Sequence, residues 1–487
     1  MYNSMRMILF TLTLAMPLAA ADLLRVSADG RGLETADGRA FLWLGDTAWE
    51  LFHRLDREEA LHYLDRRAAQ GFTVIQAVVL AEGDGLRTPN AYGQVPLIDL
   101  DPRQPNEAYF EHVDFIVREA ARRGMRVAML PTWGDKVPSS NPRPGPVVFD
   151  RDNAREYGRY LGRRYREAPI VWMLGGDRPV DSEAVAEIWR AMAQGVREGD
   201  GGAHLITFHP SGEASSAWWF HNEPWLDFNV YQSGHAARFQ PVYGMAADHL
   251  LLYPKKPFID AEPPYEDIPI AFWEFIDWSL PEPVPPSILD ESGLLVKTEF
   301  FKRGLFTDYD VRVHAYWNLL AGAAGFTYGN NAVWQMLPVG RTGAIPALHG
   351  WRDALERPGA MQMAHLRELF ERRPLAGLHP DQSIIYGRNG GGRRHLRAAL
   401  ARDHTFALVY LAEGREIKVV LGKVKGDRVR VSWFNPRTGG ATDGGERSNT
   451  GIATFIPPEI GEVEDWILVL DAGDVELPPL PREQGDT

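Results

Sequence analysis

Residues 170–177 read IVWMLGGD, an apolar run that ends in two glycines and a carboxylate. A strand that is apolar at every position is typical of a parallel sheet, because helices cover both of its faces. The two glycines allow the backbone to approach a ligand closely. The stretch therefore predicts a buried strand with a functional carboxylate, Asp177, at its carboxyl end.

Similar apolar runs alternate with helical patterns on both sides of this stretch. Residues 72–80 read FTVIQAVVL, and apolar residues recur at helical spacing over 107–123. The expected strands are, in chain order, 41–44, 72–80, 126–131, 170–174, 204–208, 226–231, 257–260 and 325–328. Eight parallel strands separated by helices favour the α/β class and a (β/α)₈ TIM barrel over an open sheet.

The pattern of apolar and polar residues changes after Pro374. Short alternating runs at 405–411, 416–421, 429–433 and 466–470 are separated by turn clusters, a pattern typical of an all-β sandwich. The predicted organisation is a signal peptide at 1–21, a catalytic barrel at 22–374 that begins with a short hairpin, and a C-terminal β-sandwich domain at 375–487. The junction at 371–375 has no Gly/Ser linker, which predicts a docked rather than a tethered domain.

The start of the chain has the pattern of a targeting segment. Arg6 precedes an apolar run over 7–18, and small residues at 19–21 form a cleavage site before Asp22. No other run is long enough to span a bilayer. We therefore expect an exported protein, secreted or periplasmic, with no membrane span after removal of the signal.

Composition excludes several classes of function. The 487 residues include 52 Lys plus Arg and 65 Asp plus Glu, a net charge of −13 without a basic block, which argues against nucleic-acid binding. There is no cysteine, and the 14 histidines include no H-x-H or H-E-x-x-H pattern. We therefore expect no metal site and no cofactor.

The carboxyl ends of barrel strands form the active site in this fold, so polar residues there are the candidates. Asp177 follows the fourth strand and Glu262 follows the seventh, and two carboxylates at a barrel mouth suit glycoside hydrolysis. For Asp46, a helix cap and a substrate ligand are equally open roles, and any one Trp is more often a core residue than a sugar platform. The substrate-binding candidates are Asp46, Trp49, Trp133, His209, Tyr231, Gln232, Asn330 and Trp334.

Local motifs carry a more specific resemblance. Residues 41–49 (FLWLGDTAW), 71–76 (GFTVIQ), 172–179 (WMLGGDRP) and 322–329 (GAAGFTYG) together resemble the apiosidase-like family, glycoside hydrolase family 140. The tail, with WFNPRTG at 433–439 and DWILVL at 465–470, resembles the small β domain labelled collagen-binding that accompanies it. Residues 375–487 show no feature specific to collagen.

The resemblance implies a retaining, exo-acting glycosidase that releases the branched pentose apiose from pectin (rhamnogalacturonan-II) side chains of the plant cell wall. It assigns Asp177 as acid/base and Glu262 as nucleophile. The carboxylates after strands four and seven also resemble those of the wider clan of retaining (β/α)₈ glycosidases, clan A. That clan uses Glu after Asn as its acid/base, whereas Asp177 follows Gly176 and has a shorter arm.

The arrangement carries expectations about protonation. A charged Glu262 should raise the pKa of Asp177, and donors from His209, Gln232 or Tyr231 should keep Glu262 ionised. Two alternatives stay open: an exo-glycosidase of the same fold that releases another terminal sugar, and a catalytically silent carbohydrate-binding protein.

Overall fold

The computed structural model describes residues 23–140, 145–278, 280 and 283–483, so the expected signal peptide at 1–21 lies outside the described residues. Within them, eight parallel strands form one sheet in the order β8-β7-β6-β5-β4-β11-β10-β9. Their bounds are β4 (Trp43–Thr47), β5 (Val74–Val78), β6 (Arg126–Leu130), β7 (Ile170–Gly175), β8 (Ile206–His209), β9 (Asn229–Tyr231), β10 (Phe258–Asp260) and β11 (Gly325–Tyr328).

The two edges of this sheet, β8 and β9, meet and nearly close it. The Asp227 amide donates to the Ile206 carbonyl at 2.9 Å, and the Thr207 hydroxyl donates to the Phe228 carbonyl at 2.7 Å. The predicted (β/α)₈ barrel is therefore confirmed.

Helices surround the barrel in the order expected from the sequence. The long ones are α2 (Arg57–Ala69), α3 (Glu107–Arg122), α4 (Arg151–Arg164), α5 (Glu183–Asp200), α7 (Val242–Leu251), α8 (Asp308–Leu320) and α11 (Pro358–Arg372). Four single-turn helices are α1 (Leu51–Arg54), α6 (Ala217–Phe220), α9 (Asn331–Trp334) and α10 (Trp351–Ala354). The helix α2 begins at a capping box, in which Asp56 accepts from the Glu59 amide at 2.8 Å and Glu59 accepts from the Asp56 amide at 3.2 Å.

The first barrel strand differs from the expected 41–44. The strand β4 runs on to Thr47, and Phe41 belongs to β3 (Ala40–Phe41) of a separate antiparallel sheet with β1 (Leu24–Val26) and β2 (Leu33–Thr35). The strand continues through Asp46 because this carboxylate is neutralised in the barrel wall, where the Arg67 Nε donates to it at 2.8 Å. The charged residue is part of the strand, not the start of the loop after it.

The residues after α11 form two antiparallel sheets. Six strands pair in the order β12-β13-β14-β19-β16-β17, and β15 pairs with β18. Their bounds are β12 (Leu378–Pro380), β13 (Leu396–Ala401), β14 (Phe406–Leu411), β15 (Ile417–Val420), β16 (Arg428–Phe434), β17 (Ala441–Ser448), β18 (Ile452–Phe455) and β19 (Trp466–Ala472). The predicted C-terminal all-β architecture is present.

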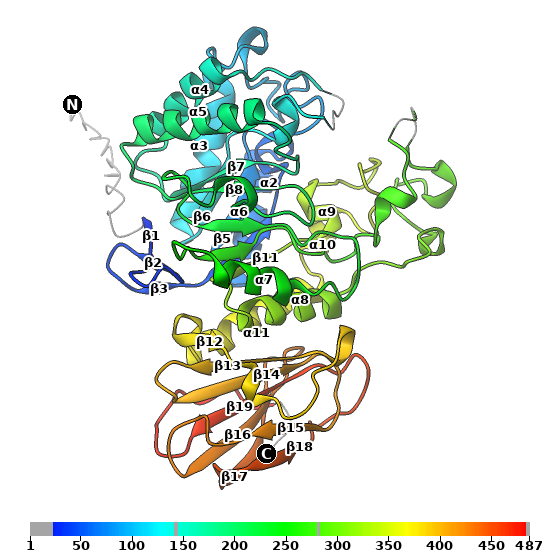
Figure 1. Cartoon of the computed structure of the whole chain (residues 1–487). Helices are drawn as coiled ribbons and strands as arrows, with labels where there is room; N and C mark the ends of the chain where they lie inside the picture. Colours follow the sequence, from blue (N-terminus) through cyan, green and yellow to red (C-terminus); the bar gives the residue numbers. More distant parts are fainter. Residues whose placement is uncertain (1–22, 141–144, 279, 281–282, 484–487) are drawn as a thin grey trace, which may run out of the picture.

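The helix α8 lies between the barrel and these sheets (Figure 1). Arg312 on α8 forms a buried ion pair with Asp465, with Nη2 and Oδ1 2.9 Å apart. The Tyr309 hydroxyl donates to the Ala412 carbonyl at 2.6 Å, and the rings of Tyr316 and Tyr410 stack with centroids 5.0 Å apart. The contact combines buried aromatic faces with a fully paired charge.

Candidate active site

A cavity of about 630 Å³ lies at the carboxyl ends of the barrel strands. Six of the residues proposed from the sequence line it together: Trp49, Trp133, Asp177, Gln232, Glu262 and Trp334. These residues follow β4, β6, β7, β9, β10 and β11, so the barrel mouth brings together segments that are far apart in the chain.

The backbone after β7 aims Asp177 into the cavity. Gly175, Gly176 and Asp177 all have positive φ, at 87°, 130° and 45°. A Cβ on Gly175 would lie 2.2 Å from the His209 carbonyl oxygen, and one on Gly176 would lie 2.8 Å from the Trp133 ring. Only glycine fits at both positions, which explains the Gly-Gly-Asp sequence at this strand end.

The surroundings of Asp177 favour its protonated form. Burial and the nearby charge of Glu262 raise the pKa of Asp177, and Arg178, His209 and a hydrogen bond from Gln232 oppose that shift only in part. Arg178 Nη1 lies 3.1 Å from Asp177 Oδ2. A carboxyl group that keeps its proton can act as a general acid.

Glu262 has the opposite environment. Its Oε2 lies 3.1 Å from His209 Nε2, and its Oε1 lies 3.4 Å from His235 Nε2. Burial raises the pKa of Glu262, but the hydrogen bonds and charges of the two histidines outweigh it and lower the pKa. Glu262 is therefore ionised where Asp177 is protonated.

The expected donors to Glu262 are only partly the observed ones. His209 contacts it, whereas the Gln232 side chain bonds Asp177. His235 was not proposed as a site residue, nor was Tyr265, whose side chain also bonds Glu262. The sequence carried a signal for both, since His235 comes just after β9 and Tyr265 just after the two prolines that follow Glu262.

Aromatic rings form one wall of the cavity. The rings of Trp49 and Trp133 lie 5.2 Å apart, and the Trp49 ring meets His209 edge-on at 5.3 Å. The Trp49 indole N–H donates to the Tyr265 hydroxyl at 3.1 Å, and that of Trp334 donates to Asn331 Oδ1 at 3.3 Å. Such fixed aromatic faces suit the apolar faces of sugar rings.

Three proposed site residues lie elsewhere. Asp46 points outward from β4 to the Arg67 guanidinium, and the Tyr231 hydroxyl bonds Asn318 on α8. Asn330 caps α9, accepting from the Ala332 amide at 2.9 Å. Side chains alternate across a strand, so Tyr231 faces α8 while Gln232, the next residue, faces the cavity. The structure does not bring these three residues into the site.

Further carboxylates line the same cavity near Asp177, namely Glu50, Glu82 and Asp135. Burial and the charges of Glu50 and Asp135 raise the pKa of Glu82 to about 8. Asp135 is neutralised by the buried Lys136, whose Nζ lies 2.9 Å from Asp135 Oδ2. Among the described residues, no group of three or more His, Asp or Glu side chains is placed to hold a metal ion.

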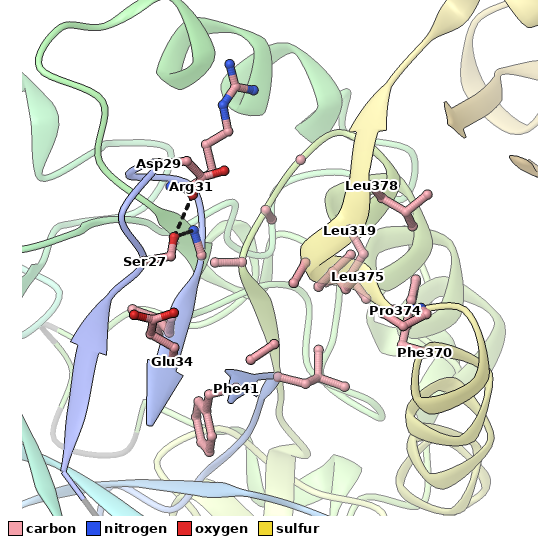
Figure 2. Close-up of a pocket in the computed structure, with 18 of the residues that line it drawn as sticks. Ser27, Asp29, Arg31, Glu34, Phe41, Leu319, Phe370, Pro374, Leu375 and Leu378 are labelled. Carbon is pink, nitrogen blue, oxygen red and sulfur yellow. Dashed lines mark hydrogen bonds between the residues drawn. The ribbon is translucent and has the colours of Figure 1, made fainter. Parts of the chain in front are cut away.

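A second cavity, of about 660 Å³, lies between the N-terminal strands and the start of the C-terminal sheets (Figure 2). Its apolar side includes Phe370 and Leu378, and its polar side includes Ser27, which donates to Asp29 at 2.7 Å. Asp29 is also paired with Arg402 of the C-terminal region. The charge of Asp29 is therefore paired within this cavity.

A nearly closed parallel barrel with two carboxyl groups of opposite pKa shift at its mouth is the arrangement typical of glycoside hydrolases. The chain belongs to the apiosidase-like family, because the model described as "Apiosidase-like, catalytic domain" matches residues 27–376. Residues 379–471 match a second model, described as "Putative collagen-binding domain of a collagenase".

Solved structures agree with this assignment. A protein described as a glycoside hydrolase is 32% identical with a TM-score of 0.79, over 93% of this chain and 98% of that one. A glycoside hydrolase family 5 protein from Bacteroides vulgatus is 30% identical with a TM-score of 0.80, over 95% and 96%. A search of curated proteins found no match. No helix of the described residues is long and apolar enough to cross a membrane.

Proposed function

We propose that this enzyme is an exported, exo-acting retaining glycosidase that removes apiose from pectin side chains of the rhamnogalacturonan-II type. One observation carries the catalytic part of the proposal: Asp177 and Glu262 line a single cavity, and their surroundings shift their pKa values in opposite directions. Paired titratable groups with divergent pKa values are the signature of an acid and its partner base or nucleophile.

The proposed mechanism has two steps. Glu262 attacks the anomeric carbon while Asp177 donates its proton to the departing glycosidic oxygen, which leaves a covalent glycosyl-enzyme. Asp177, now a carboxylate, then takes a proton from water, and that water displaces Glu262 from the sugar. His209 and His235 hold the Glu262 oxygens during both steps.

The choice of sugar is supported by the family. The family description names an apiosidase, and the wall formed by Trp49 and Trp133 suits the stacking of a sugar ring. Export is supported by the pattern at residues 1–21, where a basic residue precedes an apolar run and small residues. The plant cell wall then supplies the substrate outside the cell.

Product analysis on a panel of pectic side-chain oligosaccharides tests the proposal. We expect release of apiose by the wild-type enzyme and loss of that release in Asp177→Ala. Release of a different terminal sugar would mean that the protein is a glycosidase with another substrate. Binding of the oligosaccharides without release of any sugar would mean that the protein is a catalytically silent carbohydrate-binding protein.

A further inference from the structure

A second buried carboxylate, Asp260, lies two residues before Glu262 at the end of β10. Asp260 is fully buried. It accepts hydrogen bonds from the Ser233 hydroxyl at 2.6 Å, the Ser233 amide at 3.2 Å and the Asn318 side-chain amide at 3.0 Å. The Glu262 backbone also hydrogen-bonds to it. The mechanism above makes no use of this group.

These bonds connect the two strand ends that bear on the nucleophile. Ser233 is two residues before His235, just as Asp260 is two residues before Glu262, and His235 Nε2 meets Glu262 Oε1 at 3.4 Å. The Gly234 amide also donates to the Glu262 carbonyl at 2.9 Å. Asp260 thus adds side-chain hydrogen bonds to the backbone bond that joins the ends of β9 and β10, beside the contact between His235 and Glu262.

Asn318 connects this carboxylate to the helix beneath it. Its side-chain amide donates to Asp260 Oδ2, and its side-chain oxygen accepts from the Tyr231 hydroxyl on β9. Asn318 lies on α8, whose other side carries Arg312 and Tyr309, the residues that contact the C-terminal sheets. A continuous set of contacts thus runs from the C-terminal domain through α8 to Glu262.

We propose that Asp260 and Asn318 act as a positioning pair that holds Glu262 against His235, and that the C-terminal domain supports this pair by fixing α8. The inference rests on the proposed function, because it concerns the residue assigned as nucleophile. It also gives the C-terminal domain a role in catalysis that does not involve collagen.

The charge state of Asp260 gives the pair a distinct signature. Burial raises the pKa of Asp260 to about 6, although hydrogen bonds from Ser233 and Asn318 oppose the shift. The titratable and charged groups around it are Glu262, two residues past the end of β10, and Tyr231 on β9, with His249 on α7 and Arg397 on β13 beyond Tyr231. Only the ionised carboxylate can accept all of its hydrogen bonds, so the positioning weakens below about pH 6.

The test is the Asp260→Asn variant of the full chain, with Asp200→Asn as a matched control. Asp200 is equally buried and hydrogen-bonded, to His204 at 3.0 Å, but lies at the end of α5. We expect Asp260→Asn to lower kcat about 100-fold at pH 7.5 with little change in KM, because a small displacement of a reacting group has an effect of this size. The loss should shrink toward pH 5, and the control should keep the wild-type kcat and pH profile.

A crystal structure of the variant gives a readout that does not depend on substrate. We expect the separation of His235 Nε2 and Glu262 Oε1, 3.4 Å in the structure described above, to be clearly longer in Asp260→Asn than in a wild-type crystal grown at the same pH. An unchanged separation, or an equal loss of kcat at both pH values, would overturn the proposal. If the wild-type chain hydrolyses no glycoside, the proposed function fails while the measured separation still decides the positioning role.

Two further variants cover a failure of Asp260→Asn to fold. Ser233→Ala removes one hydrogen-bond donor to Asp260. As in Asp260→Asn, kcat should fall at pH 7.5 and the loss should shrink toward pH 5, but the fall should be smaller. Arg312→Met, at the domain contact, should also lower kcat while KM stays near the wild-type value. Wild-type kcat in both folded variants would overturn the proposal.

Discussion

Asp177 and Glu262 share one cavity, yet we expect their removal to reduce activity in different ways. Glu262→Ala loses the group that attacks the sugar, so essentially all turnover should disappear. Asp177→Ala loses only the proton donor, so it should reduce activity by a factor of about 10²–10⁴ on glycosides with poor leaving groups and far less on activated aryl glycosides. Steady-state kinetics on both substrate types measures this. Equal losses on the two would contradict the acid role, and an inverted product seen by NMR would exclude Glu262 as nucleophile.

Glu82 makes the stability of the fold depend on pH. Its pKa is raised from 4.5 to about 8, so the folded chain keeps this proton over a range in which the unfolded chain has lost it. The wild type therefore loses stability as pH rises through this window, by at most about 1.4 kcal/mol per pH unit and by less where cavity water reaches the carboxyl group. Glu82→Gln has no titratable group at this position, so its stability lacks this dependence on pH.

Melting temperatures across this range test the point. Glu82→Gln should match the wild type below pH 4.5, exceed it progressively as pH rises, and reach a constant advantage above about pH 8. A constant difference at every pH would mean that packing, and not the buried proton, separates the two proteins.

Gly176 sets the direction of the candidate acid. Its φ of 130° is strained for any other residue, and an added Cβ would lie 2.8 Å from the Gly134 amide nitrogen. Gly176→Ala should therefore lower the unfolding free energy by about 1–3 kcal/mol and remove most activity. Gly244→Ala on α7 is the control, since a Cβ there meets no described atom within 4 Å and Ala favours a helix. Denaturant titration that shows equal stability for both variants would refute the steric argument.

At the scale of elements, apolar runs predicted the barrel strands well, because a strand covered on both faces needs an apolar residue at nearly every position. The pattern was weaker where polar residues lie inside a strand. The strand β17 (ATDGGERS) is polar and has no buried residue, so no apolar alternation marked it. The strand β4 extends through a charged residue, Asp46, that forms an ion pair with Arg67. Partners that come from distant parts of the chain cannot be read from local sequence.

The same limit applies to the candidate site. The strand-end rule located the cavity-lining Trp49, Trp133 and Gln232, but it could not decide which of two adjacent residues faces inward, and Tyr231 was placed on the wrong side of β9. Asn330 caps a helix that is only one turn long, which the sequence did not signal. Facing direction depends on the exact strand register, and sequence patterns give strand ends only to within a few residues.

The helix α8 is the element that joins the two parts of the chain, and its ion pair offers a direct measurement. Arg312 and Asp465 are both buried, and Tyr410 donates a further hydrogen bond to Asp465 at 3.0 Å. Arg312→Met should destabilise the protein by about 3–5 kcal/mol, because it leaves the buried Asp465 without its charged partner. Asp465→Asn should cost less, because Arg312 keeps its ion pair with Asp308. The double variant should lose less than the sum of the two, and additive losses in chemical denaturation would show that the pair is not coupled.

The whole molecule is expected to unfold as one unit. The junction near Pro374 has no flexible linker, Arg373 forms a buried ion pair with Asp471, and Tyr309 and Tyr316 on α8 pack against the C-terminal sheets. Separating the two parts would leave these buried groups exposed or unpaired, so neither should unfold alone. Calorimetry should therefore give one transition, with the calorimetric enthalpy equal to the van't Hoff enthalpy.

Limited proteolysis examines the same coupling under native conditions. In the wild type, cleavage near residue 374 should be slow, because the chain there is held by Arg373 and the contacts of α8. Arg312→Met weakens the docking without changing the junction sequence, so it should speed cleavage at this point and split the calorimetric transition in two. A wild-type chain that releases an intact barrel within minutes would instead show a tethered domain. In that case α8 would keep its place without the C-terminal sheets. The proposal that these sheets support the position of Glu262 would then be wrong.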